Sequence, residues 1–312
     1  MPLFQAHKLK NKYWELTLFP ECGCYWETLR IFLKGEWVHL LEPLCGDTPP
    51  FHYGSFMMAP WSNRLVQGVF EFEGKRYQLR KNFPNDTAIH GDVRHRPWSI
   101  DSATSKEFVA SLDSCKFQDF NYPFKLKFKH SLELSANRLR MSLLIENLDR
   151  QHVPVGLGFH PFFKRRLTVA DKDIMVVLPA EKVYPDKKCI PTGPAVGVLG
   201  KTDLRAEKFL GNPNLDHCFT DLTGGIIRMV YSGSQVELRY QMDSIFSHVV
   251  AYAPNHPDGR AKDFIAVEPV THVNNGFNLY AKGWNGTGIK VLEPGEIWGG
   301  ACELSIVGLR HK

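Results

Sequence analysis

Hydrophobic and polar residues alternate with a period of two along much of the chain. The clearest run is 124–129, Phe-Lys-Leu-Lys-Phe-Lys, and its parity continues through Leu132 and Leu134. A turn at 135–137 follows, and the alternation resumes over 139–145. Because successive side chains of a strand point to opposite faces, this pattern predicts a β-hairpin with one buried face.

The same pattern recurs elsewhere in the chain. Alternating runs over 227–231 and 236–242 flank a Ser-Gly-Ser turn, and 70–72 and 77–79 flank a Glu-Gly turn. No long segment has a convincing helical period. We therefore predict an all-β protein, built as a large antiparallel sandwich with few short helices. No shift in composition marks a boundary, so residues 1–312 are expected to form a single domain.

Composition narrows the class of protein. Of the 312 residues, 43% are hydrophobic and 23% are charged, which is typical of a globular protein and excludes wholesale disorder. The net charge of +5 is small and spread along the chain, whereas nucleic-acid binding proteins concentrate basic residues. No run of about 18 apolar residues exists, so neither a membrane-spanning helix nor a membrane partner is expected.

The cysteines indicate a reducing compartment. There are seven, an odd number, scattered along the chain, whereas secreted disulfide frameworks are usually even and denser. The start of the chain also lacks the apolar core of a signal peptide, and we expect a cytoplasmic protein. Cys22 and Cys24 have no second pair at zinc-ligand spacing, so no metal site is expected.

Residues 153–163 place glycines and a histidine on one side of a predicted strand. Read as a strand, Pro154, Gly156, Gly158 and His160 share one face. Glycine in a strand often marks the close approach of a ligand or of another backbone. The segment predicts an imidazole standing over a floor cleared for a ligand, although a structural histidine fits the same pattern.

A carboxylate follows the apolar run of residues 264–267. Glu268 comes directly after that run, and Pro269 is expected to end the strand. Desolvation at the end of a buried strand raises the pKa of a carboxyl group, which suits a general base. A plain surface glutamate at a strand end is the alternative interpretation.

Three shorter motifs supply polar groups suited to hydrogen-bonding the hydroxyl groups of a ligand. They contain a forked cation at Arg64, an imidazole at His90 and a carboxylate at Asp216. Taken singly, these residues also fit a surface charge, a turn residue and a loop cap. No one of the three indicates a function by itself.

In chain order, these motifs resemble those of the aldose 1-epimerase, or galactose mutarotase-like, superfamily. The resemblance covers most of the chain and rests on Asn63-Arg64, Ile89-His90-Gly91, Gly158-Phe159-His160-Pro161, Asp216-His217-Cys218-Phe219 and Glu268-Pro269. It implies a β-supersandwich, which agrees with the period-two pattern. It further implies Glu268 as general base and His160 as general acid, with Arg64, His90 and Asp216 binding the sugar.

Two departures from the family's galactose-acting branch point away from galactose. Phe159 and Pro161 flank His160 where that branch has Asn and Ser, and Pro269 follows Glu268 where that branch has Thr. Two arginines, Arg94 and Arg96, also follow His90 closely. The hexose-6-phosphate 1-epimerase branch similarly uses arginines to hold phosphate, so a phosphosugar stays open as the substrate.

The implied reaction is acid/base ring opening that interconverts the α and β anomers of a hexose. One base and one acid suffice, so no cofactor is expected. Nearby carboxylates, Asp216 or Glu268 itself, are expected to raise the pKa of His160, and the pH profile should be bell-shaped. The expected partner is a small-molecule sugar, with the chain a monomer or homodimer.

Three alternatives to this interpretation stay open. The first is a hexose-6-phosphate 1-epimerase, which differs only in substrate. The second is a non-catalytic sugar-binding or sensor protein on the same fold. The third is a glycoside hydrolase, for which Asp216 and Glu268 would be the carboxylate pair.

Overall fold

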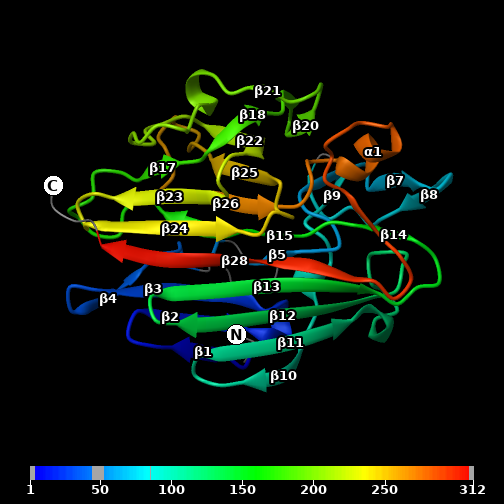
Figure 1. Ribbon diagram of the computed structural model, residues 1–312, viewed down its shortest axis with the longest axis horizontal. Helices are drawn as coiled ribbons and strands as arrows, with labels where there is room; N and C mark the ends of the chain where they lie inside the picture. Colours follow the sequence, from blue (N-terminus) through cyan, green and yellow to red (C-terminus); the bar gives the residue numbers. More distant parts are fainter. Residues whose placement is uncertain (1–3, 44–52, 85, 309–312) are drawn as a thin grey trace.

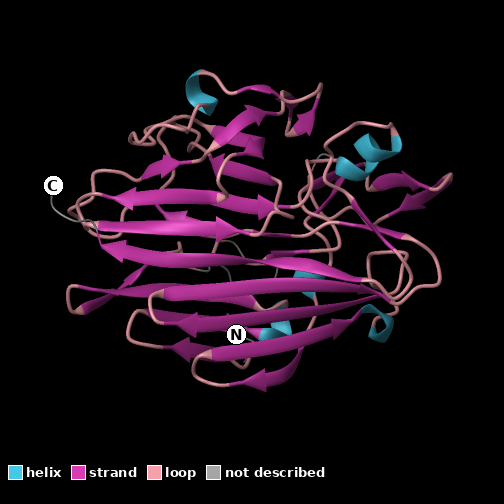
Figure 2. Cartoon of the chain, in the orientation of Figure 1, coloured by secondary structure: helices cyan, strands magenta, loops and turns pink. Residues whose placement is uncertain are grey.

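Antiparallel strands make up most of the molecule. The computed structural model describes residues 4–43, 53–84 and 86–308. Within these ranges there is one α-helix, α1 (Gly276–Ala281), and there are four 3-10 turns, at Pro20–Cys22, Val93–His95, Ser114–Lys116 and Gly200–Thr202. Figure 2 shows how little of the fold is helical. The prediction of an all-β fold with few short helices is confirmed.

One large sheet contains eight strands and faces the viewer in Figure 1. In spatial order they are β10 (Ser99–Ala103), β11 (Glu107–Asp113), β12 (Leu126–Ser135), β13 (Arg138–Asn147), β28 (Ile297–Gly308), β24 (Val236–Met242), β23 (Ile226–Tyr231) and β17 (Met175–Val177). The β12–β13 and β23–β24 hairpins are the two predicted from alternation. Along β12, buried and more exposed residues alternate without a break, as the period of two requires.

A second large sheet carries two of the candidate site residues, Asp216 and Glu268. Its strands are, in order, β21 (Val196–Gly197), β18 (Ala180–Val183), β22 (Leu215–Leu222), β25 (His248–Ala253), β26 (Phe264–Val270), β15 (Gly158–Phe159) and β5 (Met57–Met58). A short strand, β16 (Phe162–Lys164), also pairs with β26. All seven residues of β26 are buried.

Smaller sheets complete the fold. A four-stranded sheet contains β1 (His7–Lys10), β2 (Trp14–Phe19), β3 (Tyr25–Leu33) and β4 (Glu36–His39). The two-stranded sheets are β6 (Arg64–Val66) with β9 (Thr87–Ile89), β7 (Val69–Phe72) with β8 (Lys75–Gln78), β14 (Val153–Val155) with β27 (Lys290–Leu292), and β19 (Asp186–Lys187) with β20 (Ile190–Pro191). The pair β7–β8 is the third predicted hairpin.

The hydrophobic core lies between the two large sheets. Phe163 of β16 contacts Tyr240 of β24 with ring centroids 6.0 Å apart, and Phe159 of β15 contacts His130 of β12 at 6.4 Å. The same core continues to Trp14 and Leu16 of the four-stranded sheet. This packing of sheet on sheet confirms the predicted sandwich.

Two local predictions about strands were wrong. Residues 153–163 do not form one strand, because β14, β15 and β16 are separated by 156–157 and 160–161. Pro269 does not end a strand either, since β26 continues to Val270 and Pro269 pairs with Val249. A proline is tolerated there because β15 and β16 pair with β26 at Val270 and Phe264–Ala266, and Pro269 has no ladder partner on that side among the described residues.

The glycines before His160 also serve a different purpose from the one predicted. A Cβ atom at Gly156 would lie 1.9 Å from Cδ2 of His272, and one at Gly158 would lie 2.7 Å from Cγ1 of Val270. Both glycines therefore make room for protein side chains behind the strand and do not clear a floor for a ligand.

Gly156→Ala is expected to destabilise the protein by roughly 2 kcal/mol, because the added methyl group must displace the buried His272 ring. Thermal or denaturant unfolding measures the change. Gly197→Ala is the matched control, since a Cβ atom at that strand glycine meets nothing within 4 Å. Equal stabilities for the two variants would contradict the steric explanation.

Candidate active site

All five residues predicted for the site line one cleft of about 720 Å³. They come from separate parts of the chain: Arg64 from β6, His90 from the turn after β9, His160 from the break between β15 and β16, Asp216 from β22, and Glu268 from β26. The fold thus brings together residues that are up to about two hundred positions apart in the sequence.

Strand register brings His160 and Glu268 face to face. Gly158 of β15 pairs with Val270, and Phe162 of β16 pairs with Ala266, so the position opposite Glu268 falls at His160. Opposed residues of antiparallel strands have neighbouring side chains. Nε2 of His160 accordingly lies 3.2 Å from Oε1 of Glu268. Their exposed fractions are only 6% and 2%.

Aromatic rings fix the plane of the His160 imidazole. The ring stacks on Phe56 with centroids 4.6 Å apart and on Phe162 at 4.4 Å, while His90 meets it edge-on at 5.1 Å. These ring contacts restrict the orientation of the imidazole, whose Nε2 atom faces Glu268. A fixed orientation is what proton transfer to a bound substrate requires.

Burial reverses one expectation about the charges of this pair. The pKa of His160 is lowered to about 3, first by burial and then by the positive charge of Arg94. The pKa of Glu268 is raised well above its usual range by burial and by the nearby Asp216. The prediction that carboxylates raise the pKa of His160 was therefore wrong. Burial thus favours the uncharged forms of both side chains.

Arg64 and Asp216 form a second polar pair in the cleft. Nη2 of Arg64 lies 3.8 Å from Oδ2 of Asp216, which is longer than a direct hydrogen bond. The guanidinium stacks over Phe83 at 5.3 Å and donates to the Asn63 side chain at 3.2 Å. Both groups are partly exposed, so they are placed to contact the hydroxyls of a ligand.

Three buried polar atoms of the cleft-lining residues have no hydrogen-bond partner among the described residues. They are Nδ1 of His90, Nδ1 of His160 and Oε2 of Glu268. His90 is held rigidly, because its φ is +62° and its N–H donates to the Asn63 carbonyl at 3.0 Å. Buried polar atoms in native proteins are nearly always hydrogen-bonded. These three atoms are therefore available to hydrogen-bond a polar ligand in the cleft.

The sequence analysis did not single out the aromatic walls of the cleft. The lining includes six aromatic side chains: Tyr53, Phe56, Phe83, Phe162, Tyr252 and Phe264. One signal was available, because Phe162 and Phe264 lie at even spacing from His160 and Glu268 and so share a strand face with them. Apolar ring faces beside converging polar groups are typical of small-ligand sites.

Of the basic residues near the motifs, only Arg94 and Lys262 line the cleft besides Arg64. The Arg94 guanidinium lies over the Phe56 ring at 4.2 Å and has no acidic partner among the described residues. The other cations are held elsewhere by acids: Arg96 by Asp92 and Asp119, Lys164 by Glu42, Arg165 by Asp173, and Arg166 by Asp263.

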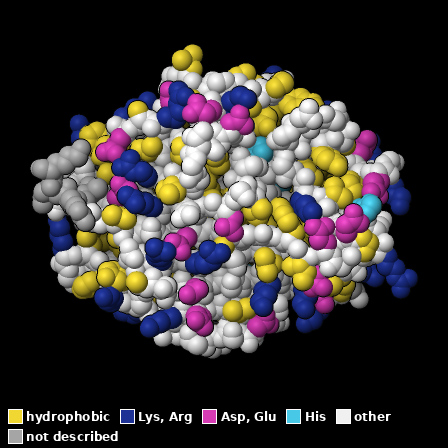
Figure 3. Space-filling model, viewed as in Figure 1, with side chains coloured by type: hydrophobic (Ala, Val, Ile, Leu, Met, Phe, Trp, Pro, Cys, Tyr) yellow, Lys and Arg dark blue, Asp and Glu magenta, His cyan; other side chains and the backbone are white. Residues whose placement is uncertain are grey.

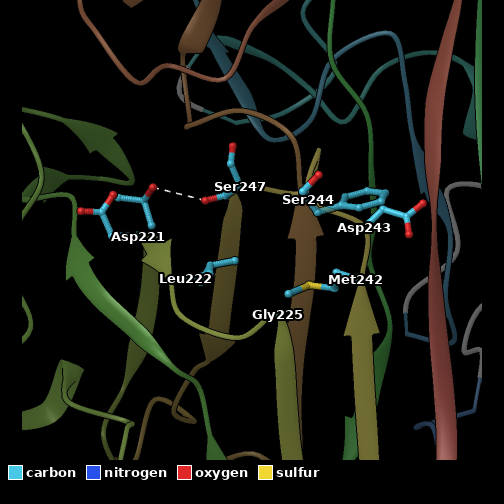
Figure 4. Close-up of a pocket in the computed structure, with 9 residues that line it drawn as sticks. Asp221, Leu222, Gly225, Met242, Asp243, Ser244 and Ser247 are labelled. Carbon is cyan, nitrogen blue, oxygen red and sulfur yellow. Dashed lines mark hydrogen bonds between the residues drawn. The ribbon is translucent and has the colours of Figure 1, made fainter.

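A second hollow has a volume of about 340 Å³ and contains fewer candidate functional groups than the cleft (Figure 4). Its two carboxylates, Asp221 and Asp243, lie on opposite sides of the hollow. Asp221 forms an ion pair with Lys182 at 2.8 Å, and Asp243 accepts the Ala301 N–H at 2.8 Å. Because Asp221 and Asp243 already have partners, neither carboxylate is available to bind a ligand.

The molecular surface shows no concentration of one charge on the face drawn in Figure 3, where basic and acidic side chains are interspersed. In the described part of the chain, no three His, Cys, Asp or Glu side chains are grouped to hold a metal ion. No helix within the described ranges is long and apolar enough to cross a bilayer.

Comparison with known proteins agrees with this geometry. The family model described as aldose 1-epimerase matches residues 41–305. The chain belongs to the aldose 1-epimerase family. The resemblance seen in the sequence motifs is thereby confirmed. Among curated relatives, the uncharacterized protein YihR of Escherichia coli (strain K12) is 28% identical over 265 residues, covering 83% of this chain and 80% of that protein.

Solved structures share the fold of this family member. A galactose mutarotase-like protein from Clostridium acetobutylicum superposes with a TM-score of 0.82 and 22% identity, covering 97% of this chain and 95% of that one. Galactose 1-epimerase from Lactobacillus acidophilus NCFM gives a TM-score of 0.75 and 18% identity, covering 97% and 94%. At these identities, the likeness shows the galactose mutarotase-like fold alone.

Proposed function

We propose that the protein is an aldose 1-epimerase that interconverts the α and β anomers of a hexose. The observation that carries the proposal is the buried pair of His160 Nε2 and Glu268 Oε1, 3.2 Å apart in a cleft with unpartnered polar atoms. Family membership supports the same reaction class. The proposed partner is therefore a small-molecule sugar.

The reaction needs two proton transfers at neighbouring oxygens. One proton leaves the C1 hydroxyl, and one is delivered to the ring oxygen, so that the ring opens to the aldehyde. After rotation about the C1–C2 bond, the ring closes on the other carbonyl face and both transfers reverse. Glu268 is the base for the C1 hydroxyl, and His160 is the acid for the ring oxygen.

The single proton of the pair must lie on His160 when ring opening begins. In the bound complex, sugar hydroxyls that donate to the Glu268 carboxylate favour its ionised form. The proton then moves to His160, 3.2 Å away, without exchange with solvent. Arg64 also favours the ionised carboxylate by its charge. Arg64, His90 and Asp216 bind the remaining hydroxyls and set the orientation of the ring.

Saturation-transfer NMR of anomer exchange tests the proposal. Glucose and galactose are the first sugars, and spontaneous mutarotation is subtracted with a protein-free sample. Asp221→Asn is the matched control, because it removes a carboxylate from the second hollow instead of the cleft. Acceleration by the wild type and by this control supports the proposal. Binding without acceleration would instead indicate a sugar sensor, and release of reducing sugar from a glycoside would indicate a hydrolase.

One observation favours a second candidate, hexose-6-phosphate 1-epimerase. Arg94 contributes a positive charge to the cleft and lacks an acidic partner in the described ranges, and Lys262 shares this property. Uncompensated cations beside a sugar site suit an anionic substituent such as phosphate.

Arg94→Met distinguishes the two candidates. If phosphate binds at Arg94, the KM for glucose 6-phosphate should rise about 10- to 100-fold, which corresponds to one lost charge-assisted hydrogen bond. The KM for glucose should change little. Arg166→Met is the control, since Arg166 is exposed and paired with Asp263. An equal loss for both sugars would remove the basis for the phosphosugar candidate.

A further inference from the structure

A strained turn lies directly behind the Asp216 carboxylate. Strands β19 and β20 are joined by Lys188 and Cys189, whose φ angles are +54° and +63°. Such two-residue turns with two positive φ values favour Asn-Gly, because a side chain is disfavoured at the second position. Cys189 occupies the position where glycine is preferred. A residue other than glycine costs conformational energy at this position, which points to a role for its side chain.

The surrounding protein holds this turn firmly. The Cys189 N–H donates to Oδ1 of Asp186 at 3.0 Å, and the Asn274 side chain donates to the Cys189 carbonyl at 2.8 Å. The other oxygen of Asp186 lies 2.7 Å from Nδ1 of His217, the residue after Asp216. The turn is thereby tied to β22 and to the segment that follows β26.

The thiol of Cys189 contacts the carboxylate of the cleft. Sγ donates to Oδ2 of Asp216 at 2.7 Å, and Cys189 itself is 8% exposed and lies outside the cleft lining. Burial, with Asp216 beside it, raises the pKa of the thiol, so the sulfur stays protonated and keeps its donor hydrogen. The same Oδ2 atom faces Arg64 at 3.8 Å.

We infer that Cys189 is a positioning residue for sugar binding, which holds the Asp216 carboxylate in place through its thiol hydrogen bond. The inference rests on the proposed function, in which Asp216 and Arg64 bind the sugar hydroxyls. Without the thiol, Oδ2 is free to move toward the guanidinium and form a direct ion pair. The Asp216 carboxylate and the Arg64 guanidinium would then bind each other and be less available to a ligand. The cleft is suited to a polar ligand, because His90 and Glu268 each have a buried polar atom without a hydrogen-bond partner in the described part of the chain.

Substitutions in the turn separate this role from a structural one. Cys189→Ala and Cys189→Gly both remove the donor, but only glycine relieves the positive φ. Each is expected to raise KM about tenfold, which corresponds to ~1.4 kcal/mol, with kcat changed less than about twofold. Cys189→Ser keeps a donor and should restore most of the affinity. Lys188→Gly is the matched control, since it relieves the same strain at an exposed position and leaves the donor intact.

Thermal unfolding of the same variants supplies the second measurement. Cys189→Gly should unfold at a higher temperature than Cys189→Ala, while both share the same KM defect. A KM that follows stability, or a Cys189→Gly variant with the KM of the wild type, would overturn the inference. A wild type that accelerates no sugar would instead be a failure of the proposed function, so the two failures are distinguishable.

Discussion

Glu268→Gln is expected to lower enzymatic anomer exchange by about 10²–10⁴-fold, which is the usual contribution of a general base. The substitution keeps the shape of the side chain and removes the group that accepts the C1 proton. Because Glu268 is 2% exposed in the middle of β26, the amide has little freedom to rearrange. Saturation-transfer NMR on the best substrate measures the loss.

The same variant should be more stable than the wild type at neutral and alkaline pH. The pKa of Glu268 is raised in the folded protein, so folding opposes its ionisation. Stability is therefore lost in the wild type as pH rises through that raised pKa, whereas glutamine has no such loss. We expect a gain of ~1 kcal/mol at pH 8, which vanishes below the ordinary pKa of a glutamate.

Asp221→Asn again serves as the control, because it removes an acid that forms a surface ion pair with Lys182. This variant should keep the activity of the wild type and gain no stability as pH rises. If Glu268→Gln retained its activity, the assignment of the base would be wrong. If its stability fell at pH 8, the carboxyl group would be ionised and satisfied in the folded protein.

The pH profile of kcat/KM should be bell-shaped, with its acid limb near pH 3. The active form of the pair carries one proton, and the acid limb marks the addition of a second. That second proton must enter a buried imidazole beside Arg94, which lowers the pKa of His160 to about 3. The alkaline limb marks the loss of the single proton, and it lies well above the ordinary pKa of a glutamate.

Independent groups with ordinary pKa values would behave differently. Ionisation of an unperturbed glutamate would place the acid limb near 4.5, and loss of the histidine proton would place the alkaline limb near 6.5. An acid limb near 4.5 would therefore contradict the shared-proton pair. Arg94→Met should move the limb upward, because the variant removes a charge that opposes protonation of His160. Circular dichroism at each pH excludes unfolding as the cause of the loss.

Much of the fold was determined by local sequence. The alternation over 124–145 and 227–242 specified hairpins, because neighbouring strands joined by short turns need only a period of two and turn residues. The five candidate site residues were also predicted from the sequence, through the order of their motifs, and all five line the cleft. Membership of the aldose 1-epimerase family could be recognised from the order of the same motifs.

The chemistry of the site was decided by tertiary structure. The contact between His160 and Glu268 arises from register across an interrupted ladder, which no local pattern encodes. The glycines before His160 were misread because their neighbours, His272 and Val270, come from a distant segment. The direction of the His160 pKa was misjudged for a similar reason. Nearby acids in a sequence suggest a raised value, but desolvation depends on the rings that enclose the imidazole in three dimensions.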